Sequence, residues 1–159
     1  MAKPVSLIFQ RSYEDSLVPE LFKTSVVVPL VKDKRGKNEM GNFRPIANGS
    51  AVCSVMQRMV GKNIQFFLER EGKLDDMQFG FVSGRSTVSQ LLYCVNDWAL
   101  MKNRGSGVHV VYFDVKSAFD RVMIDRLCVK LRNLGICSKT VQWVRALLNK
   151  CLFICRTLR

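Results

Sequence analysis

The sequence predicts a mixed α/β fold, because short β-branched or apolar runs alternate with longer segments of helical periodicity. A β-branched run occupies residues 25–31, and a near-continuous apolar run occupies residues 108–113. Between them, apolar residues recur at helical spacing over residues 51–72 and 86–104. The chain has 159 residues, of which 48% are hydrophobic and 24% are charged, as in proteins that bury a core. We expect one domain, or one domain and part of another.

A β-hairpin is expected in the first third of the chain. The run 25–31 contains Pro29, which cannot donate a hydrogen bond to a neighbouring strand and therefore indicates a strand with one exposed edge. A charged loop with Gly36 follows, and a second extended piece over residues 43–47 carries Arg44 and Pro45. The pair predicts a hairpin with a basic tip, whose charges either contact a ligand or only keep the surface soluble.

Two long amphipathic helices should follow the hairpin. Ser50 is the expected cap of the first helix and Gly72 its end, whereas the second runs from Ser86 to about Arg104, before Gly105. The apolar residues of both helices form stripes that we expect to lie in a core rather than to contact a ligand. The stripes comprise Val52, Met56, Val60, Ile64 and Leu68 in the first helix, and Val88, Leu91, Leu92, Val95 and Trp98 in the second.

The last third of the chain predicts further strands and helices. The run 108–113 is apolar at nearly every position, which is typical of a strand covered on both faces. Two shorter helices are expected at about residues 124–134 and 141–149. Residues 150–158 could form a final strand, and either this segment or a partner would then have to cover the open edge of the strand 108–113.

The charge balance favours a polyanionic partner. The chain has 25 Lys and Arg residues and 13 Asp and Glu residues, which gives a net charge of +12. The stretch from Arg121 to the end contains nine basic residues and one acidic residue, Asp125. Basic side chains that neutralise phosphates release counterions, so nucleic acid is the expected partner, with a solvated basic surface as the alternative.

The six cysteines predict free thiols. None belongs to a C-x-x-C pair and there is one histidine, so neither a zinc site nor a disulfide framework is expected. No window approaches the ~18 consecutive apolar residues of a membrane span. Reduced thiols fit an intracellular protein, nuclear or cytoplasmic.

Asp114 is the main candidate for chemistry, because it ends the predicted strand 108–113. Sheet edges tend to bind ligands, and a rigidly held carboxylate suits a hard divalent cation. Asp114 could instead cap the following turn. Asp120, six residues later, reads more simply as a salt-bridge or turn residue.

Three stretches together resemble the reverse transcriptases of retrotransposons that lack long terminal repeats (LINE-type elements). Val28-Pro29-Leu30-Val31-Lys32 with Asn42-Phe43-Arg44-Pro45-Ile46-Ala47 is similar to the fingers hairpin, and residues 78–87 are similar to the Gly-rich segment before the palm. Residues 113–122 are similar to the first catalytic motif. Motifs in the family's order form a stronger signal than each alone. The resemblance implies a fingers region in residues 1–105 and the truncated start of a palm in residues 106–159.

The resemblance also implies an RNA template, a DNA primer and a deoxynucleotide as partners, with Mg²⁺ as the cofactor. Asp114 would bind the two Mg²⁺ ions of phosphoryl transfer. Lys32 and Arg44 would contact the triphosphate, with Lys34 as a substitute for Lys32. Phe119 would lie under the sugar and exclude a 2′-hydroxyl, unless it is simply a core aromatic.

Less specific roles follow for the Gly-rich segment. Gln78, Gly80 and Arg85 would lie near the template and the nucleotide. Val82 stands where the family usually has Arg, which removes one cation from this surface.

The Ser-Gly-x-Pro-Gln-Gly and Ala-Asp-Asp segments of the family do not occur in the chain. Asp114 would then be a lone catalytic carboxylate, so we expect the chain by itself to be inactive. The alternatives are a non-catalytic nucleic-acid-binding remnant and an unrelated α/β domain whose motif matches are accidental.

Overall fold

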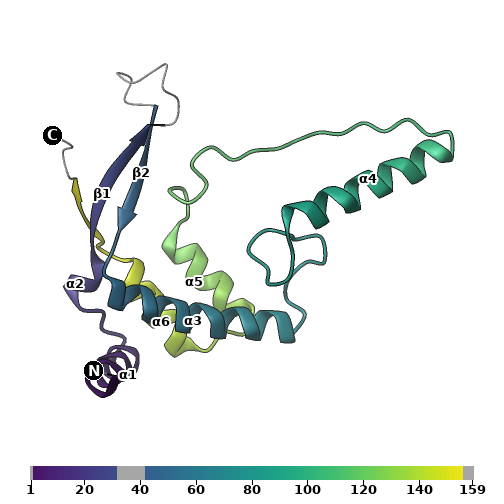
Figure 1. The fold of residues 1–159 in the computed structure, drawn as a ribbon. Coiled ribbons are helices and arrows are strands. Elements are labelled where there is room, and N and C mark those ends of the chain that lie inside the picture. The colour runs from purple at the N-terminus through teal and green to yellow at the C-terminus, as the bar shows by residue number, and fades with distance from the viewer. Residues whose placement is uncertain (1, 32–41, 156–159) are drawn as a thin grey trace. The chain divides into compact units, whose positions relative to one another are not determined.

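The computed structural model describes residues 2–31 and 42–155, and these residues form a mixed α/β fold, as predicted. The chain divides into two compact units (Figure 1). Unit 1 comprises residues 1–64 and 122–159, and unit 2 comprises residues 65–121. These units are defined by contacts, whereas fingers and palm are functional regions, so the boundary near residue 105 stays a prediction.

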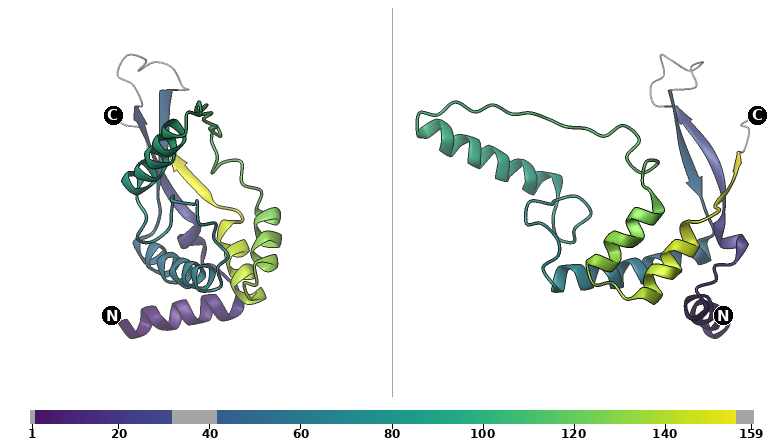
Figure 2. Two further views of the ribbon diagram at one scale, coloured as in Figure 1. Left: turned by 90° about the vertical axis from the view of Figure 1, so that its right-hand side faces the viewer. Right: turned by 180° about the vertical axis from the view of Figure 1, so that it is seen from behind.

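The sheet of unit 1 has the strand order β2-β1-β3. The predicted hairpin is confirmed: β1 (Thr24–Val31) pairs antiparallel with β2 (Phe43–Asn48), from Val26 opposite Asn48 to Val31 opposite Phe43. The charged loop at the tip lies outside the described residues. The views in Figure 2 show β3 (Leu152–Cys155) beside β1, to which it is parallel.

Two expectations about these strands are wrong. The strand around Pro29 was expected at an edge of the sheet, but β1 is central, because β3 pairs with Thr24–Val27. Within the described residues this pairing stops before Pro29, which explains how a residue without an N–H is tolerated there. The predicted last strand does form as β3, but it extends the hairpin sheet and does not cover the run 108–113.

The helices α3, α5 and α6 begin and end largely where the sequence predicts, and the last residues of α3, from Gln65 on, belong to unit 2. α3 (Ala51–Arg70) starts after Ser50, whose carbonyl accepts from the Ser54 amide at 2.9 Å. Gly72 follows with φ +58°, a left-handed conformation that ends helices and favours glycine. α5 (Ile124–Asn133) matches its prediction, and α6 (Ser138–Leu148) begins three residues earlier than expected.

The core of unit 1 forms where α1 (Ala2–Asp15) and the short α2 (Glu20–Lys23), neither of which was predicted, join the other helices. Trp143 of α6 is 1% exposed and packs with Val18 and Met56. Partly buried apolar side chains surround these three: Phe9, Tyr13, Phe22, Val60, Val144, Ala146 and Leu147.

Polar contacts attach α1 to α6 beside this core. The Trp143 indole N–H donates to the buried Ser12 hydroxyl at 3.2 Å, and the hydroxyls of Tyr13 and Thr140 are 2.7 Å apart. The exposed Cys137 thiol lies 3.0 Å from the Thr140 hydroxyl. This contact and the Thr140 amide lower the pKa of Cys137; burial opposes them, and the Tyr13 hydroxyl and the Lys139 amide add smaller lowering effects.

Unit 2 contains α4 (Thr87–Asn103), whose predicted ends are confirmed. Ser86 and Ser89 form a reciprocal capping box, and Gly105 takes φ +75° after the helix. The apolar stripe of α4, however, was wrongly expected in a core. No residue of α4 is buried, and Val88, Leu91, Leu92 and Val95 are exposed, because no described element packs over this stripe.

The strand predicted at residues 108–113 does not form. These residues and Asp114 have no regular secondary structure, and the Phe113 side chain is 92% exposed. A strand exists only through hydrogen bonds to a neighbour, and no described segment pairs with this run. Apolar composition alone therefore predicted the wrong local structure.

The five cysteines whose side chains are described are free thiols, namely Cys53, Cys94, Cys128, Cys137 and Cys151. Burial, with a smaller contribution from Cys151, raises the pKa of Cys53. No helix among the described residues is long and apolar enough to span a membrane.

Replacing Trp143 should destabilise unit 1 strongly. Trp143→Ala leaves a cavity in the core and should lower the free energy of unfolding by about 3–5 kcal/mol. Trp143→Phe removes the bond to Ser12 but keeps an aromatic ring, and should cost about 1–2 kcal/mol. Urea unfolding followed by circular dichroism measures both. Trp98→Ala on α4 is the matched control, and an equal loss there would contradict the assignment of the core.

Candidate functional site

The candidate residues are divided between the two units. The Gly-rich loop (residues 78–86) and the acidic segment (residues 113–122) flank α4 in the sequence, and both lie in unit 2 except for Val122. Arg44 lies in unit 1, on β2. Lys32 and Lys34 lie outside the described residues.

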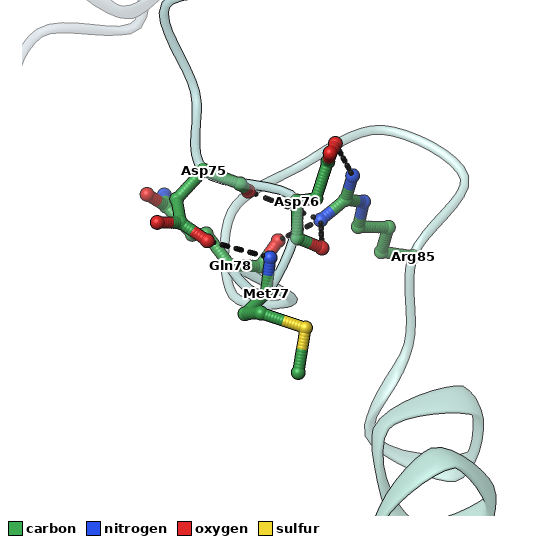
Figure 3. Close-up of polar contacts among 5 residues, drawn as sticks. All are labelled: Asp75, Asp76, Met77, Gln78 and Arg85. Atoms are coloured by element: carbon green, nitrogen blue, oxygen red, sulfur yellow. Dashed lines mark hydrogen bonds and ion pairs between the residues drawn. The ribbon is translucent and has the colours of Figure 1, made fainter.

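The Gly-rich loop is organised around the guanidinium group of Arg85 (Figure 3). Its Nη1 donates to the carbonyl oxygens of Asp76, of Gln78 at 2.7 Å and of Asp75 at 3.3 Å. Nη2 lies 3.7 Å from the Asp76 carboxylate. The Met77 amide donates to the Asp75 carboxylate at 2.7 Å and tightens the same turn. Arg85 thus binds the first residue of its loop and the two aspartates that precede the loop.

Aromatic contacts continue this arrangement. The Arg85 guanidinium lies 5.5 Å from the centre of the Phe79 ring, a cation–π distance, and Phe79 lies 6.3 Å from Tyr93 of α4. The loop is therefore attached to α4 by a chain of three side chains. Val82, which replaces the family's usual Arg, is half-buried, and its carbonyl accepts from the Arg85 amide at 3.3 Å.

Gln78 and Gly80 contact each other within the loop. The Gln78 side-chain amide donates to the Gly80 carbonyl at 3.2 Å. A Cβ added to Gly80 would meet no atom within 4 Å, so this glycine leaves open space at the loop surface. Both residues lie where a ligand could approach, although the Gln78 amide is already engaged.

The Gly-rich loop and the acidic segment meet through two phenylalanines. The rings of Phe81 and Phe119 pack edge to face, with their centres 6.2 Å apart and their planes at 89°. Phe81 is 89% exposed and Phe119 is 79% exposed, so Phe119 is not a core aromatic. Phe81 has φ +61°, which is uncommon for a bulky residue. Phe81 was not singled out from the sequence; its position after Gly80 in a turn-rich loop was the available signal.

Asp114 is exposed in an irregular part of the chain and does not end a strand. The expectation that a sheet edge would hold its carboxylate rigidly is therefore not met by the described residues. Within residues 2–31 and 42–155, no group of three or more His, Cys, Asp or Glu side chains could hold a metal ion. One carboxylate is too few ligands for a divalent ion, so these residues do not by themselves fit a metal site.

Arg44 is the described cation of the predicted triphosphate site. It is exposed on β2, opposite Leu30 of β1. An arginine that projects from a hairpin strand can reach a polyanionic ligand without losing the strand's hydrogen bonds.

Replacing Arg85 should loosen the Gly-rich loop without unfolding α4. Arg85→Lys keeps the charge but loses the forked donors, so amide hydrogen exchange at Met77 and Gln78 should rise by roughly five- to ten-fold, for bonds worth about 1 kcal/mol or more. Exchange measured by mass spectrometry or NMR tests this. Arg104→Lys makes the same change after α4 and should leave the loop unchanged; equal exchange in both variants would contradict the role of Arg85.

Comparisons with known proteins agree with the resemblance drawn from the motifs. The chain is 25% identical over 128 residues to the "Probable RNA-directed DNA polymerase from transposon X-element" of Drosophila melanogaster, which covers 80% of the chain. It is also 25% identical to the "Probable RNA-directed DNA polymerase from transposon BS" and to the "RNA-directed DNA polymerase from mobile element jockey", both of Drosophila melanogaster, over 82% of the chain. The chain spans 14% of the length of each of these relatives.

The family model described as "Reverse transcriptase (RNA-dependent DNA polymerase)" matches residues 32–158. This match includes the part of the hairpin segment that begins at Lys32 and the whole of the other two motif segments. It therefore excludes the alternative that the chain is an unrelated α/β domain. The chain therefore belongs to the reverse transcriptase family.

Proposed function

We propose that the chain supplies nucleotide-contacting surfaces to the RNA-directed DNA polymerase of a retrotransposon. The observation that carries this proposal is the contact between Phe81 and Phe119. It joins the Gly-rich loop to the acidic segment, which are two of the family's motif segments on opposite sides of α4 in the sequence. A polymerase needs such segments to meet, because base, sugar and phosphate of one nucleotide are contacted together.

Phe119 is proposed to contact the sugar of a deoxynucleotide. Its exposed ring could fill the space of a 2′-hydroxyl and so disfavour ribonucleotides. Lys32 and Arg44 are proposed to bind the triphosphate, where the forked donors of arginine suit phosphate oxygens. Arg44 lies on β2 of unit 1, and Lys32 lies outside the described residues.

Gln78, Gly80 and Arg85 are proposed to lie near the template and the nucleotide. The contacts of Arg85 favour an indirect role, because its guanidinium group binds carbonyl oxygens of its own loop. Arg85 would therefore shape the surface that Gln78 and Gly80 present, rather than pair with a phosphate.

Reverse transcriptases use divalent metal ions, and we propose Mg²⁺ as the ion and Asp114 as one of its ligands. A carboxylate oxygen has the hardness that Mg²⁺ prefers, but a complete site needs further ligands. We therefore assign no catalytic step to the chain by itself, and its lack of polymerase activity stays a prediction.

Replacing Phe119 should reduce the preference for deoxynucleotides. Wild type should bind dATP more tightly than ATP. Phe119→Val should reduce the ratio of the two dissociation constants roughly ten-fold, which is the order of discrimination that one added group causes in an apolar site. Titration of fluorescent dATP and ATP in the presence of Mg²⁺ measures both constants. Phe66→Val, an exposed phenylalanine of the same unit, is the control. A ratio that Phe119→Val leaves unchanged would refute the sugar contact.

A second candidate function is nucleic-acid binding without catalysis, and the distribution of charge favours it. Unit 1 carries 18 of the 25 basic and 6 of the 13 acidic residues, whereas unit 2 has seven of each. The net charge of +12 is therefore that of unit 1. Arg126 and Lys130, one turn apart on α5, line a groove of about 420 Å³ on this unit. Such paired cations can contact successive phosphates.

Binding to single-stranded RNA should weaken steeply with salt. Each phosphate contact contributes about −0.7 to the slope of log K against log salt. Arg126→Ala with Lys130→Ala should therefore make the slope shallower by about 1.4. Fluorescence anisotropy over a series of salt concentrations measures it. The control is the double variant Lys102→Ala with Arg104→Ala, which removes the same charge from unit 2. It should change the salt slope less. Salt-insensitive binding by wild type would rule out this mode.

A further inference from the structure

We propose that Phe81 and Phe119 form an aromatic corner that holds one unpaired nucleotide, with its base stacked on the ring of Phe81. The inference rests on the proposed function, because it takes Phe119 as the contact for the sugar. It adds a partner for the base, which the motifs did not supply. The ligand class is a nucleobase with its sugar, either in a single strand or in a free nucleotide.

The geometry of the pair leaves room for such a ligand. The two ring planes stand at 89°, with their centres 6.2 Å apart, so an edge of one ring meets the other ring. Phe81 is 89% exposed and Phe119 is 79% exposed, so most of both rings remains open. Two open rings at a right angle offer one flat face for a base and one adjacent wall for its sugar.

The backbone holds Phe81 in this exposed position. Its φ of +61° is costly for a residue with a large side chain, and such conformations persist where the surrounding structure imposes them. Here the surrounding structure includes the Arg85 guanidinium group, which binds the carbonyl oxygens of Asp76 and Gln78. Phe81 is therefore presented to solvent by a built loop rather than by fraying.

A nucleobase fits this corner better than a phosphate does. Unit 2 has equal numbers of basic and acidic residues, so it offers no net charge to attract a polyanion. Stacking on an aromatic ring requires no charge and accepts any base, because every base has a π-face. The corner should therefore contribute affinity that hardly depends on salt, in contrast to the basic surface of unit 1.

The test compares Phe81→Leu and Phe81→Tyr in the whole 159-residue chain. The probes are a short single-stranded DNA, the same strand with abasic sites throughout, and dATP. Phe81→Leu should weaken binding of the base-bearing strand or of dATP by roughly ten-fold, the order of one lost base–aromatic stack. Phe81→Tyr should retain the affinity because it keeps a ring. Neither variant should change binding of the abasic strand or the salt slope.

The control is Phe66→Leu, which removes another exposed ring of unit 2 and should have no effect. Loss on the strand alone identifies a template base as the occupant, and loss on dATP alone identifies the incoming nucleotide. Three outcomes would refute the aromatic corner: an equal loss of affinity for the abasic strand, an equal effect of Phe66→Leu, or no loss of affinity for any probe. Wild type that binds none of the probes would overturn the proposed function as well. Circular dichroism of the variants verifies that they fold.

Discussion

The burial of Trp143 is the interaction on which unit 1 depends. The indole packs against Val18, which follows α1, and against Met56 of α3, so one side chain joins segments from both ends and the middle of the unit. Its N–H would be costly to bury without a partner, and Ser12 supplies one. Because β3 follows α6 directly, fixing Trp143 also brings β3 to the edge of β1. The hairpin with Arg44 is thereby supported on a three-stranded sheet, which is more stable than an isolated hairpin.

Unit 2 is ordered by a different kind of interaction. No residue of its helix α4 is buried, so apolar packing cannot fix the Gly-rich loop. The Arg85 guanidinium group takes over this task by binding three carbonyl oxygens and by stacking on Phe79. Hydrogen bonds to a charged group are stronger than those between neutral groups, although each contributes little when it is exposed to water. These bonds allow the loop to keep Phe81 and Gly80 at its surface although α4 has no buried residue.

The sequence predicted those elements whose signals are local. The ends of α3 and α4 follow from Ser50, Gly72, Ser86 and Gly105, and the hairpin follows from two extended runs around a charged loop. The failures all depend on distant partners. The run 108–113 lacks a neighbouring strand among the described residues, the stripe of α4 lacks a covering element there, and α1 gains its place from Trp143 near the other end of the chain. The resemblance to the family placed Arg85 near the template and the nucleotide, whereas its hydrogen bonds to carbonyl oxygens depend on how the loop turns and have no signal in the sequence.

The two units carry complementary chemistry for nucleic acid. Unit 1 holds the whole net charge, which acts over about a Debye length and does not distinguish one base from another. Unit 2 is neutral overall and exposes aromatic rings, which act only on contact. Charge on unit 1 raises the rate at which a strand is encountered, and the aromatic corner of unit 2 adds stacking affinity that accepts any base.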